Sequence, residues 1–227
     1  IEDVLAAMRR GEPIIVADDE CRENEGDLIV AAEKVTDKTI NFLARHGRGL
    51  ICVALTAGRL ARLRIGRMAS RHGGDSHHTA FMESVDAREG VTTGISAADR
   101  ARTIRALVAD ETRPEDLVSP GHVFPLEARE GGTLRRAGHT EASVDLARLA
   151  GLKPAAVICE VLREDGRMAR VPQLLRIARR FGLKFTSVAN LIAYRRKREK
   201  LVELVRTVLL PTQYGKFKLK LYRSIPD

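Results

Sequence analysis

Short apolar runs alternate along the chain with stretches in which apolar residues recur every three or four positions. The runs predict strands, and the wider spacing predicts amphipathic helices. The expected strands are Ile14–Ala17, Leu28–Ala32, Leu50–Leu55, Ala80–Asp86 and Ala156–Leu162. The expected helices run from Ile1 to Gly11, Thr36 to His46, Ser96 to Val108, Thr140 to Leu149, Pro172 to Gly182 and Ser187 to Leu204.

Two stretches depart from this alternation. Residues 57–78 are rich in Arg, Gly and His, and we expect a loop with a short helix there. From about Thr207 the sequence alternates again, as in Lys218-Leu219-Lys220-Leu221. This pattern predicts one or two strands that begin a new unit without completing it.

Composition narrows the class of protein. The 227 residues carry a formal net charge of +9, yet ten Lys and Arg and only three acids lie in 195–227. With no Trp and 4% aromatic residues, surfaces for stacking bases are scarce, so we expect no nucleic-acid partner. No apolar run approaches the ~20 residues that span a bilayer, so we expect no membrane partner. The three cysteines lack metal-finger spacing and favour a reducing, cytoplasmic setting.

The most unusual segment is Asp18–Asp27, in which six of ten residues are carboxylates. It connects two apolar runs, so it is expected to form a strand-to-strand turn. So many acids in one turn repel each other unless positive charge is nearby. The candidates are a hard divalent cation with oxygen ligands, a basic substrate, or plain solvation.

A second segment, Arg135–Thr140, opens a predicted helix. Gly138 permits close backbone approach, and a helix N-terminus offers free N–H groups to a phosphate. His139 is a candidate metal ligand. The alternative is that Thr140 only caps the helix and His139 is a surface residue. Together with the acidic segment, this one indicates a metal-assisted site for a small phosphorylated substrate.

Three further positions are candidates for chemistry. His122 lies in Pro120–Leu126, which we expect to be a loop fixed by two prolines; it suits proton transfer or is a structural histidine. The side chain of Glu160 should lie on the same face of its strand as that of Ile158. Glu160 is then either a candidate general base or a surface acid at the end of the strand. The hydroxyls of Gly90–Ser96 are a second candidate anion or sugar contact, unless Ser96, with Asp99 at the capping-box position, only caps a helix.

Taken in order, these segments resemble the 3,4-dihydroxy-2-butanone 4-phosphate synthases of riboflavin biosynthesis. The resemblance extends from residue 1 to about residue 200. The matching stretches are Asp18–Ile29, Gly90–Arg100, Pro120–Leu126, Arg136–Leu146 and Cys159-Glu160, followed by Asp165–Arg170.

The resemblance implies an α/β (α+β) layered sandwich, with a mixed, mainly antiparallel sheet and helices on both faces. It also implies a homodimer with sites close to the subunit interface. The expected reaction converts D-ribulose 5-phosphate to 3,4-dihydroxy-2-butanone 4-phosphate and formate, through enolisation, dehydration, skeletal rearrangement and loss of C4. Mg²⁺ (or Mn²⁺) would polarise substrate oxygens.

The family's functional residues transfer by matching motif positions. Glu23 and His139 would be the metal ligands, and His122 and Glu160 the catalytic residues of the proton transfers. Cys52 would lie near the site. The substrate contacts would be Arg22, Glu23, Asp27, Thr92, Arg136, Ala137, Gly138, His139, Thr140 and Glu160.

Several positions depart from the family pattern. Cys21 replaces a fourth acid, and Ala137 stands where many members have Gly. Ile65–Met68, Arg71–His78 and Phe81–Asp86 also differ. These departures motivate one alternative, an inactive synthase-like dimerisation scaffold. A nucleotide- or RNA-binding module, driven by the basic tail, is a second alternative that the scarcity of aromatic residues disfavours.

The end of the chain resembles a different family. Leu210–Phe217 and Tyr222-Arg223 are similar to the opening strands of GTP cyclohydrolase II. We therefore expect a synthase domain over residues 1–204. Residues 205–227 would be a linker and the truncated start of a cyclohydrolase-like domain, without cyclohydrolase activity, from a bifunctional chain.

Overall fold

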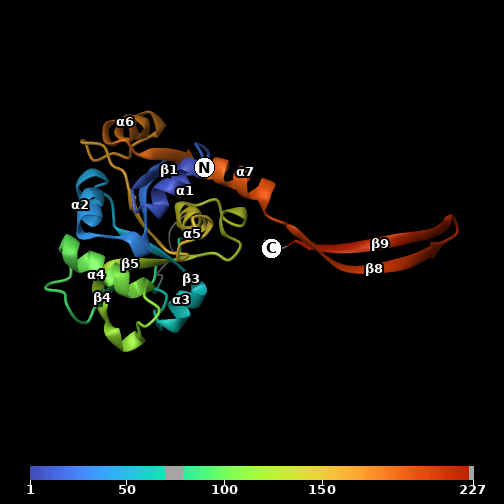
Figure 1. The fold of residues 1–227 in the computed structure, drawn as a ribbon, viewed down its shortest axis with the longest axis horizontal. Helices are drawn as coiled ribbons and strands as arrows, with labels where there is room; N and C mark the ends of the chain where they lie inside the picture. The colour runs from blue at the N-terminus through green and yellow to red at the C-terminus, as the bar shows by residue number, and fades with distance from the viewer. Residues whose placement is uncertain (70–78, 225–227) are drawn as a thin grey trace.

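The body of the protein is a seven-stranded sheet, seen in the computed structural model, which describes residues 1–69 and 79–224 (Figure 1). Its strands are β1 (Ile14–Ala17), β2 (Gly26–Ala31), β3 (Cys52–Thr56), β4 (Val85–Ala87), β5 (Leu117–Ala128), β6 (Ala156–Glu160) and β7 (Lys184–Ser187). They are arranged in the order β4-β5-β3-β6-β2-β1-β7. The pairs β1–β2, β2–β6, β3–β6 and β4–β5 are antiparallel, whereas β1–β7 and β3–β5 are parallel. The predicted mixed, mainly antiparallel sheet is therefore confirmed.

Helices cover both faces of this sheet. The α-helices are α1 (Glu2–Arg9), α2 (Asp37–His46), α3 (Ala57–Arg62), α4 (Ala97–Val108), α5 (His139–Leu149), α6 (Val171–Phe181) and α7 (Val188–Arg198). The 3₁₀ turns are η1 (Ala32–Lys34), η2 (Pro114–Asp116) and η3 (Gly132–Leu134). Among the described residues, no helix is long and apolar enough to cross a membrane.

The sheet separates two apolar cores, because side chains alternate between the faces of each strand. One core packs α2, α3, α4 and α6 against residues such as Val157 and Cys159 of β6. The other packs α1, α5 and α7 against residues such as Ala156 and Ile158 of the same strand. Glu160 therefore shares a face with Ile158, as the sequence predicts.

The prediction that Pro120–Leu126 is a loop was wrong, because this segment lies inside β5. Val123 and Leu126 are buried, and Phe124 and Pro125 align with residues of β3. Gly121 permits the close approach of β4, since a Cβ atom there would lie 2.1 Å from the carbonyl carbon of Val85. Prolines and glycine are typical of loops, but the pairing of β5 with a strand on each side stabilises the extended conformation despite them.

Two predicted boundaries were also wrong. The strand expected over Ala80–Asp86 is reduced to β4, with isolated bridges at Phe81 and Met82. The last helix ends at Arg198 instead of Leu204. The apolar residues of 199–204 fit a helical spacing, but a strand begins at Val202 and pairs with a later one. Arg71–His78 lie outside the described residues.

That later pairing forms a hairpin of β8 (Val202–Thr212) and β9 (Gly215–Ser224), which projects away from the sheet (Figure 1). Its two faces differ. Leu210 lies opposite Phe217 and Val208 opposite Leu219, whereas the alternate positions of β9 are the lysines of residues 216, 218 and 220. The large apolar side chains of the hairpin are exposed.

A buried ion pair connects α7 to α5 and to the turn η3. Arg195, only 3% exposed, donates to Asp145 Oδ2 at 2.6 Å and to the carbonyl of Gly131 at 3.0 Å. The hydroxyl and the amide of Thr133 donate to the same carboxylate oxygen, at 2.7 and 2.8 Å. Arg195 also pairs with Glu199, at the base of the hairpin, at 2.7 Å.

We expect Arg195→Met to lower the free energy of unfolding by about 3 kcal/mol, because it leaves the buried Asp145 carboxylate with only the exposed Arg148 as a cationic partner. Chemical denaturation followed by circular dichroism measures this change. Arg198→Met is the matched control, since Arg198 is exposed and its pair with Glu2 contributes less than about 1 kcal/mol. Equal effects of the two variants would contradict the prediction.

Candidate active site

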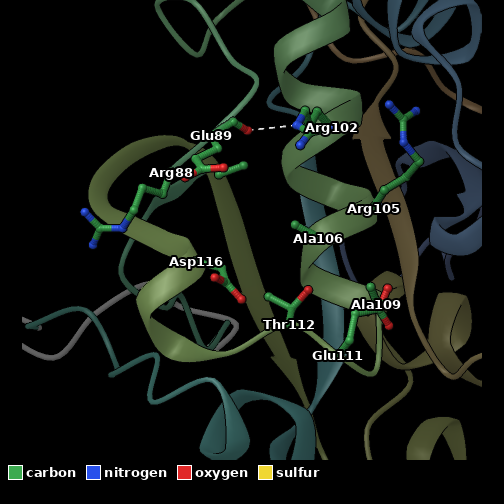
Figure 2. A pocket seen from close by; sticks show the side chains of 10 residues that line it. Arg88, Glu89, Arg102, Arg105, Ala106, Ala109, Glu111, Thr112 and Asp116 are labelled. Atoms are coloured by element: carbon green, nitrogen blue, oxygen red, sulfur yellow. Dashed lines mark hydrogen bonds between the residues drawn. The ribbon is translucent and has the colours of Figure 1, made fainter.

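One pocket is a candidate by shape alone. It has a volume of about 330 Å³ and lies between α4 and η2 (Figure 2). Its charged lining is balanced, with three arginines (88, 102 and 105) and three acids (89, 111 and 116). None of the residues predicted for the active site lines it. The chemistry must therefore be sought elsewhere, at the strand ends that carry the acidic segment.

The acidic segment is the turn between β1 and β2, and Asp18 organises it. The amides of Glu25 and Glu23 donate to the Asp18 carboxylate at 2.8 and 3.1 Å. Arg22 donates to the same carboxylate at 2.8 Å and pairs with Glu23 at 2.7 Å. The turn thus tolerates its charge because N–H groups and one internal guanidinium neutralise the innermost acid.

Two further contacts fix this turn on the body of the protein. Arg170, the residue before α6, donates to the carbonyl of Glu23 at 2.6 Å. Gly26, the first residue of β2, has no room for a side chain, since a Cβ atom would lie 2.3 Å from Leu174. The turn is therefore held between α6 and the sheet.

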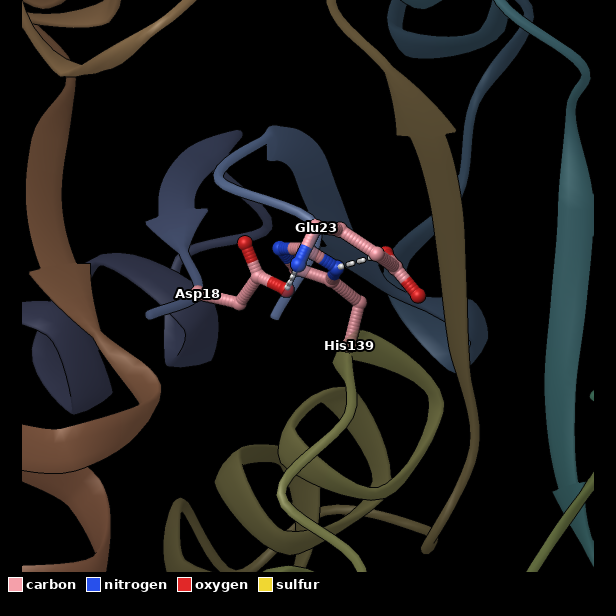
Figure 3. A group of neighbouring side chains, drawn as sticks. All are labelled: Asp18, Glu23 and His139. Atoms are coloured by element: carbon pink, nitrogen blue, oxygen red, sulfur yellow. Dashed lines mark hydrogen bonds and ion pairs between the residues drawn. The ribbon is translucent and has the colours of Figure 1, made fainter. Parts of the chain in front are cut away.

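His139 is brought against this turn by the start of α5 (Figure 3). Its Nδ1 atom lies 3.6 Å from Glu23 Oε2. Burial alone would lower the pKa of the imidazole, but the carboxylates of Asp27, Glu23 and Asp18 outweigh burial and raise the pKa to about 9. Its Nε2 atom is buried and has no hydrogen-bond partner among the described residues.

These side chains form a candidate metal cluster. Ligand atoms of Asp18, Glu23 and His139 all lie within 4.8 Å of one another (Figure 3). Two carboxylates suit Mg²⁺ or Mn²⁺, and the imidazole would add a nitrogen ligand once it releases a proton, which a bound cation favours. The donor set therefore fits a divalent cation. The pairing of Glu23 with His139 was predicted from the sequence; Asp18 was not, and its only signal was its place just after a strand.

Glu160 and Asp27 lie side by side next to this cluster, because they are partners in the β2–β6 ladder. The Leu50 amide donates to Glu160 Oε2 at 2.8 Å, which gives this carboxylate the partner that its apolar neighbours demand. Burial raises the pKa of Asp27 to about 7; His139 opposes this shift and Glu160 adds to it. Asp27 therefore titrates near neutral pH when no metal is bound.

His122 is held by an acid that the sequence analysis did not assign. Its Nδ1 atom lies 2.7 Å from Asp86 Oδ2, and its amide donates to Asp86 Oδ1 at 3.0 Å. Phe124 and Ile158 are both ladder partners of Cys52. Since His122 lies two residues before Phe124 and Glu160 two residues after Ile158, the register directs both toward Leu50, from opposite sides.

The Gly90–Ser96 segment packs over this histidine. A Cβ atom at Gly94 would lie 2.2 Å from Asp86 and 2.4 Å from His122 Nδ1. Thr92 donates through its amide (3.0 Å) and its hydroxyl (2.7 Å) to Asp99. Ser96 accepts from the Asp99 amide, as predicted, but the Asp99 carboxylate turns to Thr92 and Gly94 and leaves the capping box half formed.

The Arg136–Thr140 segment is tightly built. Arg136 pairs at 2.7 Å with Glu141, whose side chain is 1% exposed. Gly138 lies against this pair, since a Cβ atom would be 2.4 Å from the Arg136 guanidinium. Ala137 is exposed, whereas Gly138, His139 and Thr140 are buried at the start of α5. The amides of the first turn of α5, which begins at His139, are thus presented beside the candidate metal cluster.

The cysteines are not poised as nucleophiles. Burial raises the pKa of Cys159 to about 12 and raises the pKa of Cys52 further, so both thiols are protonated at neutral pH. Cys159 is a core residue, as predicted. Cys21 is exposed in the acidic turn, where its amide donates to Asp19.

Comparison with known proteins gives one consistent family. A family model described as 3,4-dihydroxy-2-butanone 4-phosphate synthase matches residues 2–194. Riboflavin biosynthesis protein RibBA of Aquifex aeolicus is 54% identical over 225 residues, which cover 98% of this chain and 55% of that protein. RibBA of Synechocystis sp. is 52% identical over 229 residues, covering 100% of this chain and 41% of that protein. The chain spans about half the length of these curated relatives.

Solved structures agree. RibBX, a two-domain 3,4-dihydroxy-2-butanone 4-phosphate synthase from A. baumannii, superposes with a TM-score of 0.91 at 48% identity. This match covers 100% of our chain and 66% of that one. A 3,4-dihydroxy-2-butanone 4-phosphate synthase in complex with two magnesium ions has a TM-score of 0.82 at 44% identity, covering 87% and 96%.

The Thr92–Asp99 contact predicts a pH effect. Hydrogen bonds from Thr92, Ser96 and Gly94 lower the pKa of Asp99 from its ordinary 3.8 to about 2. The contribution of the Asp99 carboxylate to the stability of the fold is therefore complete above pH 3.8 and is lost as the pH falls through 2. Thr92→Val removes the hydroxyl donor, so we expect a higher pKa for Asp99 and a smaller loss of stability below pH 3.8. Carboxyl ¹³C NMR titration measures the pKa.

Thr93→Val, at the neighbouring exposed position, is the matched control for Thr92→Val. It should leave the pKa of Asp99 unchanged. An unchanged pKa in Thr92→Val itself would contradict the assignment of the Thr92 hydroxyl as a donor to Asp99.

Proposed function

Because the chain belongs to the 3,4-dihydroxy-2-butanone 4-phosphate synthase family, we propose that it converts D-ribulose 5-phosphate to 3,4-dihydroxy-2-butanone 4-phosphate and formate in riboflavin biosynthesis. The observation that supports this most strongly is the contact between Glu23 in the acidic turn and His139 at the start of α5. It joins a candidate cation site to a helix N-terminus suited to phosphate, and Glu160 lies next to it. The substrate carries the two chemical features, vicinal oxygens and a phosphate, that such a junction binds.

The phosphate of the substrate would be held by the Arg136–Thr140 segment. The first amides of α5 point out of the helix and attract an anion, and Gly138 lets the ligand approach the backbone. Arg136 adds positive charge at the same place, and its pair with Glu141 fixes its direction. Arg22, Asp27 and Thr92 would contact the remaining hydroxyls, as would Ala137 through its backbone.

Glu160 and His122 would move the protons. The Leu50 amide holds Glu160 in position to accept a proton from a substrate carbon or hydroxyl. With Nδ1 of His122 donating to Asp86, its Nε2 atom is free to accept a proton and return it. Asp27, whose pKa lies near neutrality, can share a proton with Glu160 across the ladder.

A divalent cation, Mg²⁺ or Mn²⁺, held by Glu23 and His139 would act as a Lewis acid toward the substrate oxygens. The overall reaction is balanced without any other reagent, because the five carbons of the substrate divide into a four-carbon phosphate and formate. The side chains described above therefore need only to bind, orient and transfer protons.

We further propose that the enzyme acts as a homodimer in the cytoplasm, with small-molecule substrate as its ligand and without nucleic acid. The free thiols of Cys21, Cys52 and Cys159 support a reducing compartment. The weak aromatic content supports the exclusion of nucleic acid.

The test is formate release from D-ribulose 5-phosphate by the 227-residue chain. We expect no formate after treatment with EDTA and recovery with added Mg²⁺ or Mn²⁺. Glu23→Gln and His122→Ser should each reduce the rate by about 10²–10⁴-fold, because a ligand or a proton-transfer group is lost. Glu115→Gln, an exposed acid on η2, is the control and should keep the rate of the parent.

Failure of this test has a definite meaning. A folded protein that releases no formate with either metal would favour the inactive dimerisation scaffold, with Cys21 and the departures over 65–83 as the cause. Unchanged rates in both site variants would show that Glu23 and His122 are not the reacting groups.

We also propose that residues 1–204 are the synthase domain and that 205–227 are a linker and the start of a GTP cyclohydrolase II-like domain. In support, β8 and β9 pair with each other, and their apolar side chains are exposed, as expected for strands whose covering layer lies in another part of a longer protein. The greater length of the curated relatives supports the same view.

A chain that ends at Lys200 should therefore release formate from D-ribulose 5-phosphate at the same rate as the 227-residue chain, because the hairpin contributes no residue to the proposed site. Neither chain should release formate from GTP. Loss of synthase activity or of folding in the shortened chain, measured by formate assay and circular dichroism, would make the hairpin part of the synthase unit.

A further inference from the structure

A second pocket, of about 270 Å³, is dominated by positive charge. Three segments form it: the end of α2 with the turn that follows, the residues after β6, and one face of α6. Four arginines line it, Arg48, Arg163, Arg176 and Arg180, against a single acid, Glu164. The pocket between α4 and η2 is different, because its arginines and acids are equal in number (Figure 2).

The arginines of this basic pocket are largely unneutralised. Arg163 pairs with Asp165 at 2.5 Å. Within residues 1–69 and 79–224, Arg48, Arg176 and Arg180 have no carboxylate within ion-pair distance. Arg176 and Arg180 are four residues apart on α6, where like charges repel. Three exposed guanidinium groups without a carboxylate partner in the described part of the chain, one of which (Arg180) lies over the Phe181 ring, surround one hollow and attract anions to it.

Two rings of the pocket lining, those of His46 and Phe181, pack against each other. The rings of His46 and Phe181 lie 4.5 Å apart, and Phe42 packs on both. Burial, followed by the charges of Arg45, Arg180 and Arg48, lowers the pKa of His46. The lowered pKa favours the neutral imidazole, which has one N–H to donate.

The backbone of Arg48 is also unusual. Its φ angle of 71° lies in the left-handed region, which glycine adopts easily and arginine rarely does. The conformation is held by a bridge between Arg48 and Val161. Strained backbone conformations cluster at functional sites, although Asn24 and Arg64 of this chain also have positive φ angles.

We propose that this basic pocket binds a small anion of the pyrophosphoryl class. Its volume is below that of pockets for drug-sized ligands, so it suits the anion itself and not a whole nucleotide. Planar guanidinium groups match phosphate oxygens in pairs, and Arg48 on one segment can face Arg176 and Arg180 on another across two linked phosphates.

The lining of this anion site contains none of the residues proposed for the active site, although Arg48 and Leu162 each lie two residues from a member of the Leu50–Glu160 contact. Ala169 and Ile177 of its lining belong to the apolar core on the α2–α4–α6 face of the sheet. The proposed active site lies on the opposite face, where α5 supplies His139 and β6 directs Glu160 beside Ile158. Binding of the anion therefore does not depend on the proposed lyase reaction.

The experiment is isothermal titration calorimetry of the 227-residue chain with inorganic pyrophosphate, at low ionic strength and without added divalent metal. We expect one site per chain. Arg176→Ala combined with Arg180→Ala should weaken binding by about tenfold or more, because two charge-assisted contacts are lost. Arg179→Ala, on the same helix but outside the pocket, is the matched control and should keep the affinity within about twofold.

Alanine is the best helix former, so these variants should keep α6, and circular dichroism checks that they do. Arg180→Gln offers a milder variant with the same expected direction. As a site-specific readout, the ring protons of His46, assigned with His46→Gln, should shift in NMR spectra during the titration. Parallel titrations with inorganic phosphate and with adenosine diphosphate distinguish a free anion from the diphosphate end of a nucleotide.

Three outcomes would overturn the proposal. The first is the absence of pyrophosphate binding by the parent chain. The second is equal weakening by Arg179→Ala, which would mean that diffuse positive charge on α6 is responsible. The third is unchanged binding in the double variant, which would place the anion elsewhere, for example at the Arg136–Thr140 segment.

Discussion

The end of β1, the start of β2 and the end of β6 bring several carboxylates close together in a partly buried place. Their mutual repulsion must be offset, and the rest of the site is arranged to offset it. Each acid is relieved in a different way. Asp18 receives backbone amides and Arg22, Glu23 shares Arg22 and faces His139, and Asp27 holds its proton up to about pH 7. Removing one of these compensations shifts the charge balance of all the others.

The same repulsion explains why the proposed site residues are themselves held by hydrogen bonds from surrounding groups. Arg170 binds the carbonyl of Glu23, the Leu50 amide binds Glu160, and Asp86 binds His122. None of these partners lies beside its target in the sequence. The side chains of such a site are held in precise positions because the strands of the sheet fix them, and loops alone do not.

The sequence predicted the parts of the molecule whose signals are local. The strand β6 and the facing of Glu160 follow from alternation, and the helix predicted from Thr140 is α5, which begins one residue earlier at His139. Asp86 beside His122 and Asp18 beside His139 depend on strand order and register, which single-sequence patterns do not encode. The segments around Pro125 and Val202 were misjudged because pairing with distant strands outweighs their local preferences.

The long reach of these pairings has a consequence for synthesis on the ribosome. The acidic turn follows β1, but β1 is completed as an interior strand only when Lys184–Ser187 pair with it. Arg170 and Leu174, which fix the turn, are also translated late. The acidic turn thus waits for nearly the whole domain before it takes its final shape, and a nascent chain stalled earlier lacks the assembled candidate cation site.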